Sequence, residues 1–170
     1  MHDEIINQAR EILTQRLYRT DTLASPQDTA SYLALQLGNR EQEVFSVIFL
    51  DNRNHVLNYQ EMFHGSIATT PVYPREIARQ ALKLNAAAVI CSHNHPSGNT
   101  EPSVQDKAIT LNIQKVMELI DVRLVDHIVV GGGYSRLRPR VHHRAKSGYT
   151  ARSPVRLRED FQGKNQRGEG

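Results

Sequence analysis

Apolar and polar positions change period several times along the chain, and these changes predict its first elements. Residues 3–19 place apolar side chains near helical spacing, so we expect an amphipathic helix there. A second helix is predicted from residue 26, a proline, to about residue 38, a glycine. Residues 44–50 are β-branched and aromatic and predict a strand, which a turn connects to a returning strand over residues 55–64.

The second half of the chain alternates helical and extended patterns. A helix is expected over residues 74–85, followed by a short apolar strand over residues 86–91 that is buried on both faces. Helical spacing returns from about residue 104 to residue 120, and residues 122–130 predict a last strand. This order of elements predicts a mixed α/β domain.

Charge divides the chain unevenly. Residues 134–170 contain ten Lys and Arg against three Asp and Glu, whereas residues 1–133 contain eleven against fifteen. The net charge of +3 therefore combines an acidic body with a basic tail. Residues 138–170 show neither helical nor strand periodicity, so we expect a disordered tail whose only nucleic-acid binding is weak and non-specific.

Several features predict a cytoplasmic protein that does not enter the membrane. There is no apolar run of about 18 residues, and the first residues lack the basic start and apolar core of a signal peptide. The single cysteine, Cys91, excludes an intrachain disulfide. Alternation points Cys91 to the same side as His93, but we expect a small buried residue and not a ligand.

Candidate chemistry is concentrated in the residues that follow the strand at 86–91. His93 and His95 are two residues apart, so in extended backbone both imidazoles project to one side and can share a cation. Asp106 follows Ser103 by three residues, at the start of the next predicted helix. Two nitrogens and one oxygen suit zinc, and three protein ligands leave the fourth position open, as in catalytic sites.

Each part of this motif also has a structural interpretation. A His-x-His pair in a loop seldom binds metal by itself, and Ser103 with Asp106 forms an ordinary capping box. The complete spacing, His-x-His followed by Ser103 and Asp106, resembles the signature of JAMM (MPN+) zinc metallopeptidases. The residues from His93 to Gly98, together with Pro102, resemble the sequence of the RadC branch of that superfamily.

The resemblance covers residues 26–133 and implies a JAMM/MPN-type fold, a curved mixed β-sheet flanked by helices. It also implies a zinc metallopeptidase that hydrolyses amide or isopeptide bonds of a protein or peptide substrate. In that mechanism Glu61, shortly before a glycine, acts as general base and Ser103 stabilises the oxyanion. Glu76 is the rival base, although it falls within a predicted helix.

Two neighbouring residues are candidates for supporting roles. His127 is interpreted as a structural histidine or as a residue that contacts a ligand, because three ligands are already present. Asp126 is a candidate acceptor that orients a ligand imidazole. No strand is expected after the glycines at 131–133, which departs from RadC-like domains.

The predicted organisation is an N-terminal helix at residues 1–25, a RadC-like JAMM/MPN domain at residues 26–137 and the basic tail at 138–170. Two alternatives to a peptidase stay open. The domain could bind zinc without hydrolysing anything, or it could be a DNA-repair-associated module, as the RadC name suggests.

Overall fold

The computed structural model describes residues 2–19, 26–65 and 71–139 of the chain. Within these ranges the helices and strands follow one another as predicted, with one additional strand at the end. Their bounds are α1 His2–Arg19, α2 Pro26–Leu37, β1 Val44–Leu50, β2 Val56–His64, α3 Pro74–Lys83, β3 Ala88–Asn94, α4 Val104–Leu119, β4 Arg123–Val130 and β5 Tyr134–Leu137.

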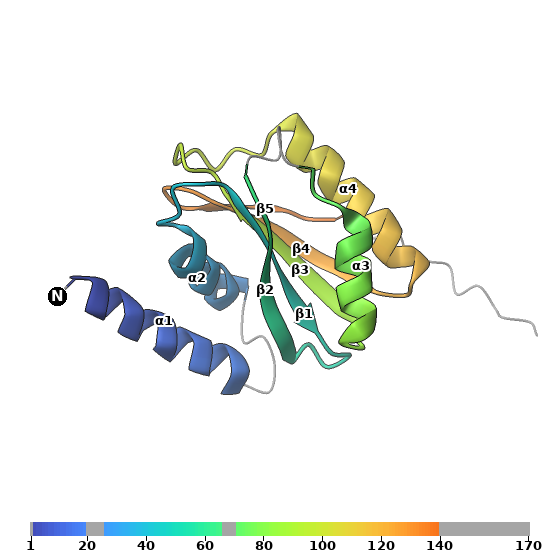
Figure 1. Cartoon of the computed structure of the whole chain (residues 1–170), viewed down its shortest axis with the longest axis horizontal. Coiled ribbons are helices and arrows are strands. Elements are labelled where there is room, and N and C mark those ends of the chain that lie inside the picture. Colours follow the sequence, from blue (N-terminus) through green and yellow to red (C-terminus); the bar gives the residue numbers. More distant parts are fainter. Residues whose placement is uncertain (1, 20–25, 66–70, 140–170) are drawn as a thin grey trace, which may run out of the picture. The chain divides into compact units, whose positions relative to one another are not determined.

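The five described strands form one mixed sheet in the order β2-β1-β3-β4-β5 (Figure 1). Strands β3 and β4 are parallel, and the other neighbouring pairs are antiparallel. Parallel neighbours need a crossover connection, and α4 supplies it between β3 and β4. This connection places the start of α4 near the end of β3, where the candidate ligands lie.

Strand β1 is buried on both faces because helices cover the sheet on both sides (Figure 1). Phe45, Val47 and Phe49 belong to a core shared with α3 and α4, and the intervening Val44, Ile48 and Leu50 belong to a core shared with α2. The alternation follows from the period of two in an extended chain. It defines two faces of the sheet, called here the α4 face and the α2 face.

The structure corrects the prediction that no strand follows the glycines at 131–133. Tyr134–Leu137 forms β5, which pairs with β4 from Val130↔Tyr134 to His127↔Leu137. Four residues are too few to show an alternation in sequence, and an edge strand is specified mainly by the ladder that it joins. Arg136 adds an ion pair with Asp126 of β4.

Strand β3 also differs from its prediction, since it begins at Ala88 and extends to Asn94. His93 is therefore a residue of the central strand itself. No helix in the described part of the chain is long and apolar enough to cross a membrane. The predicted basic tail at 138–170 lies, from residue 140 onward, outside the described residues.

Candidate metal centre

His93 is held rigidly because it lies on the central strand of the sheet. Its side chain is fully buried and packs parallel to the ring of Phe45, its neighbour on β1, at 6.2 Å between ring centroids. His95 follows β3 directly, and its backbone N–H donates to the carbonyl of Val130 at 2.8 Å. The two histidines thus extend from the same strand end toward one side, as the His-x-His spacing predicts.

Asp106 reaches the same point from the first turn of α4. The Ser103 hydroxyl oxygen accepts the N–H of Asp106 at 3.1 Å, and a carboxylate oxygen of Asp106 accepts the N–H of Ser103 at 2.7 Å. This is the capping box that the sequence also indicated. The box and the ligand set are therefore compatible, because the cap holds the carboxylate in one orientation while leaving it facing the histidines.

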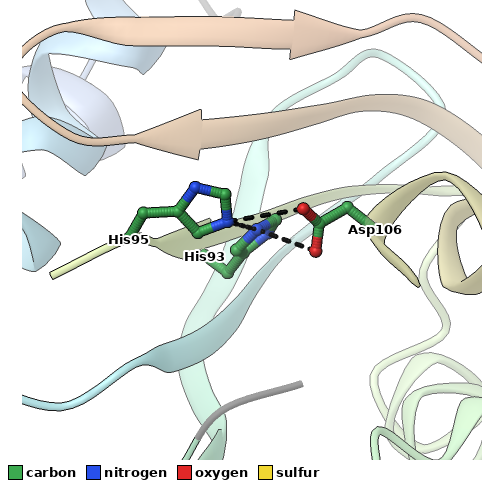
Figure 2. A group of neighbouring side chains, drawn as sticks. All are labelled: His93, His95 and Asp106. Carbon is green, nitrogen blue, oxygen red and sulfur yellow. Dashed lines mark hydrogen bonds and ion pairs between the residues drawn. The ribbon is translucent and has the colours of Figure 1, made fainter. Parts of the chain in front are cut away.

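The three side chains point toward one another (Figure 2). Nε2 of His93 lies 3.2 Å from Asp106 Oδ1, Nε2 of His95 lies 3.3 Å from Asp106 Oδ2, and the two Nε2 atoms are 3.0 Å apart. Ligand atoms bound tetrahedrally to zinc at 2.0–2.1 Å are about 3.3 Å apart. The spacing and the donor types therefore fit a zinc ion.

The orientation of His95 supports this fit. Its Nδ1 lies 2.7 Å from the carbonyl oxygen of Asn99, and because a carbonyl can only accept, Nδ1 carries the hydrogen. With this hydrogen on Nδ1, His95 presents Nε2 toward the other two residues. Its side chain is 17% exposed, whereas those of His93 and Asp106 are 0% and 2% exposed, so solvent approaches the group from the side of His95.

The electrostatics of the group favour a cation. Burial alone raises the pKa of the Asp106 carboxyl, but the neighbouring His93 imidazole and the hydrogen bonds at Ser103 outweigh it and hold that pKa well below its usual range. Asp106 is therefore an ionised carboxylate at neutral pH. Among the residues that the structure describes, this is the group of His, Cys, Asp and Glu side chains that could hold a metal.

His127 contacts the group from β4, as a residue behind a ligand would. Its Nε2 lies 2.8 Å from Nδ1 of His93, and its Nδ1 lies 2.5 Å from the hydroxyl of Thr110. Burial lowers the pKa of His127 well below its usual range, so this imidazole is neutral. Thr110 was missed from sequence, although its position one helical turn after Asp106 was a usable signal.

Two other predicted candidates do not join the group. Asp126 does not orient a ligand imidazole: it accepts the backbone N–H of His127 and the guanidinium of Arg136. Alternation explains this correction, because adjacent residues of β4 face opposite sides of the sheet. Cys91 is fully buried, and burial raises the pKa of its thiol, which favours the neutral form over a metal-binding thiolate.

Glu61 lies on the α2 face of the sheet, opposite Ser46 of β1. A bulge between Phe45 and Ser46 causes this placement, because Phe63 still faces Phe45 and a regular ladder would have put Glu61 opposite Val47 on the α4 face. The Glu61 carboxylate accepts the guanidinium of Arg40 at 2.5 Å. The rival Glu76 lies on α3 and pairs with Arg79 at 2.8 Å.

Another acidic residue, Glu43, precedes β1 and was not singled out from sequence. Its carbonyl accepts the N–H of Gly65 at 2.8 Å, which continues the β1–β2 pairing past Val44. In extended backbone Glu43 projects to the same side as Phe45, the residue that stacks on His93. The two-residue spacing between Glu43 and Phe45 could have suggested a shared face, but only once it is known which face of the sheet Phe45 occupies.

The comparisons with known proteins agree with this architecture. A family model described as RadC-like JAB domain matches residues 23–141. A UPF0758 protein of Vibrio cholerae is 45% identical over 127 residues, which cover 75% of this chain and 80% of the relative. UPF0758 proteins of Halorhodospira halophila and Chromobacterium violaceum are 52% and 47% identical over 74% and 75% of this chain.

The chain spans only 56% and 57% of the length of the last two relatives. The five-stranded mixed sheet with flanking helices is consistent with a JAB/MPN fold and confirms the predicted fold class. A family model that covers most of the chain, together with relatives near half identity, leaves one assignment: the chain belongs to the RadC-like JAB domain family.

Proposed function

We propose that this domain is a zinc-dependent hydrolase that cleaves amide or isopeptide bonds in a protein or peptide substrate. The observation that carries the proposal is the convergence of His93, His95 and Asp106, with donor atoms 3.0–3.3 Å apart and access from the His95 side. Three protein ligands and an open position are the arrangement of catalytic zinc sites. A zinc ion bound there would lower the pKa of a water molecule to about 7 and polarise a scissile carbonyl.

A general base is needed to take the proton from that water and return it to the leaving amine. The register of β1 favours Glu43, because it projects to the same face as Phe45 and His93. Glu61, the base predicted from the family resemblance, stays a candidate, but it would have to leave Arg40 and act from the opposite face of the sheet. We therefore propose Glu43 as the base and test both.

Ser103 is the proposed donor to the oxyanion. In the capping box its oxygen accepts the N–H of Asp106, so that bond does not use the hydroxyl hydrogen. The hydrogen can be donated to charge that develops on the substrate carbonyl oxygen. Because Ser103 is held by the same cap as Asp106, the donor and the ligand keep a constant separation.

A zinc-binding interaction domain without hydrolytic activity is the second candidate. The Arg40–Glu61 ion pair favours it if Glu61 is the base that the chemistry requires, since this carboxylate is paired with a guanidinium on the α2 face of the sheet. A DNA-repair-associated module has no comparable support in the described residues.

The test begins with elemental analysis of the purified chain, which should contain about one zinc per chain, and with a peptide-library cleavage screen. Glu43→Gln should retain zinc and lose about 10²–10⁴-fold in the rate of cleavage, as expected for loss of a general base. Glu41→Gln, two residues away, is the matched control and should cleave normally. His93→Ala should lose both zinc and cleavage.

Each contrary result has a defined meaning. A rate lost in Glu61→Gln and kept in Glu43→Gln would assign the base to Glu61. A zinc-loaded wild-type chain that cleaves no library member would favour the interaction domain. Purified chain without zinc that also fails to take it up would remove the basis for both candidates.

A further inference from the structure

A chain of buried hydrogen bonds leads away from the metal group to a threonine on α4. His93 Nδ1 lies 2.8 Å from His127 Nε2, and His127 Nδ1 lies 2.5 Å from the Thr110 hydroxyl oxygen. That hydroxyl is in turn 2.5 Å from the backbone carbonyl oxygen of Asp106. His93 and His127 are fully buried and Thr110 is 6% exposed, so solvent does not compete for these bonds.

The carbonyl end sets the direction of every bond in the chain. A carbonyl oxygen carries no hydrogen, so at 2.5 Å the hydrogen between it and Thr110 belongs to the hydroxyl. The Thr110 oxygen must then accept from His127, which places the His127 hydrogen on Nδ1. A neutral His127 has a lone pair on Nε2 and accepts from Nδ1 of His93. Nε2, the other ring nitrogen of His93, then faces Asp106 and His95 and is the nitrogen available to a metal.

If Nδ1 of His93 instead accepted the hydrogen bond, Nε2 of His127 would have to donate it, and His127 would need a second hydrogen. Both nitrogens of His127 would then donate, and His93 would carry its hydrogen on Nε2, where a metal could not bind. His127 is fully buried, and among the described residues no carboxylate is hydrogen-bonded to it, so a charged His127 ring would be costly. The hydrogen-bond geometry and the burial therefore select the same tautomer.

We propose that His127 and Thr110 are positioning residues that hold His93 in the tautomer that binds the metal. Thr110 lies on α4 with Asp106, and His127 lies on β4 beside β3, which carries His93. The hydrogen bonds therefore also connect the two elements that carry Asp106 and His93. The proposal rests on the proposed metal site but not on hydrolysis. Mutation of residues that hydrogen-bond to metal ligands typically lowers metal affinity by about 10- to 100-fold.

The first test measures the zinc affinity of the 170-residue chain by competition with a chromophoric chelator. Thr110→Val keeps the shape of the side chain but removes the oxygen that accepts from His127. His127 and His93 can then adopt the tautomers with the hydrogen on Nε2, so zinc affinity should fall about 10- to 100-fold. Thr110→Ser restores the hydroxyl and should restore affinity. Thr29→Val, a buried threonine on α2, is the matched control and should bind as wild type.

The second test needs no variant and separates this proposal from the proposed function. Long-range ¹H–¹⁵N spectra of the metal-free wild-type chain should show a hydrogen on Nδ1 of both His93 and His127. Absence of a hydrogen on Nδ1 of His93, or wild-type affinity in Thr110→Val, would overturn the proposal. If the wild-type chain takes up no zinc, the proposed function fails. The spectra still decide whether the hydrogen bonds from His93 through His127 to Thr110 run in the proposed direction.

Discussion

The side-chain oxygen of Asn94 accepts the backbone N–H of Val44 at 2.8 Å, so the residue between the two histidines also holds the start of β1. Its amide nitrogen donates to the backbone carbonyls of Arg40 and Gln42 at 3.3 and 3.1 Å. The segment that these three bonds hold includes Glu43. The middle residue of the His-x-His motif thereby connects the proposed base to the proposed ligands, a relationship that the motif alone does not reveal.

Replacing this amide should destabilise the fold. Asn94→Ala leaves the Val44 N–H and two carbonyls without their side-chain partner, and each buried unsatisfied group costs about 1–3 kcal/mol. Urea denaturation should show a fall of at least about 1 kcal/mol in the free energy of unfolding. Asn112→Ala, on the exposed side of α4, should change it by less than about 0.5 kcal/mol. Equal effects of the two variants would contradict the stabilising role assigned to the Asn94 hydrogen bonds.

Metal removal should lower thermal stability, because the ionised Asp106 and Nε2 of His95 converge on one point. Zinc bound only by the folded chain adds about 2.7 kcal/mol when free zinc is at 100 times the dissociation constant. Differential scanning calorimetry with zinc and with excess chelator should therefore give separated melting temperatures. The separation should disappear in His95→Ala and persist in His55→Ala, whose histidine bonds Asp51 in the β1–β2 turn.

The elements that position the site could be predicted because each has a strong local cause. The apolar, β-branched and aromatic run at β1 and β3 specifies buried strands, and Ser103 with Asp106 specifies a helix start. Since His93 lies on β3 and His95 follows it directly, their convergence with Asp106 required only that the helix begin beside the strand end. Short-range patterns were therefore sufficient for the candidate ligands.

The choice between Glu43 and Glu61 as the proposed general base depends on long-range strand pairing, which sequence periodicity does not contain. A single extra residue in β2, at the bulge opposite Phe45 and Ser46, decides whether Glu61 faces the metal group or the opposite side. Strand β5 was missed for a related reason, because its four residues gain their structure from pairing with β4. The partner of Asp126 was missed with it, since Arg136 lies on that strand.

Tyr59 should make the fold sensitive to alkali. Its burial raises the pKa of the phenol from 10.0 to about 12. Between these values the unfolded chain loses the Tyr59 proton while the folded chain keeps it, so stability falls as the pH rises. Between about pH 9 and about pH 11, urea denaturation should show a loss of about 1 kcal/mol that Tyr59→Phe removes. Tyr134→Phe, on β5, should retain the loss; an equal loss in Tyr59→Phe would assign it to other groups.

The basic tail, residues 138–170, should separate nucleic-acid binding from the metal site. The positive charge of the chain is concentrated after residue 134, whereas residues 1–133 are acidic, so we propose that any affinity for DNA comes from the tail. Deleting residues 138–170 keeps β5 and should leave zinc content unchanged while abolishing that affinity.

The binding of the undeleted chain should be electrostatic. Lys and Arg side chains that contact phosphates release counterions, so the logarithm of the affinity should fall linearly with the logarithm of the salt concentration and should not depend on sequence. Salt titrations of both chains against two unrelated duplexes make the measurement. Equal binding after deletion, or a strong preference for one duplex, would mean that the acidic body recognises DNA itself, and that result would revive a repair-associated role for this domain.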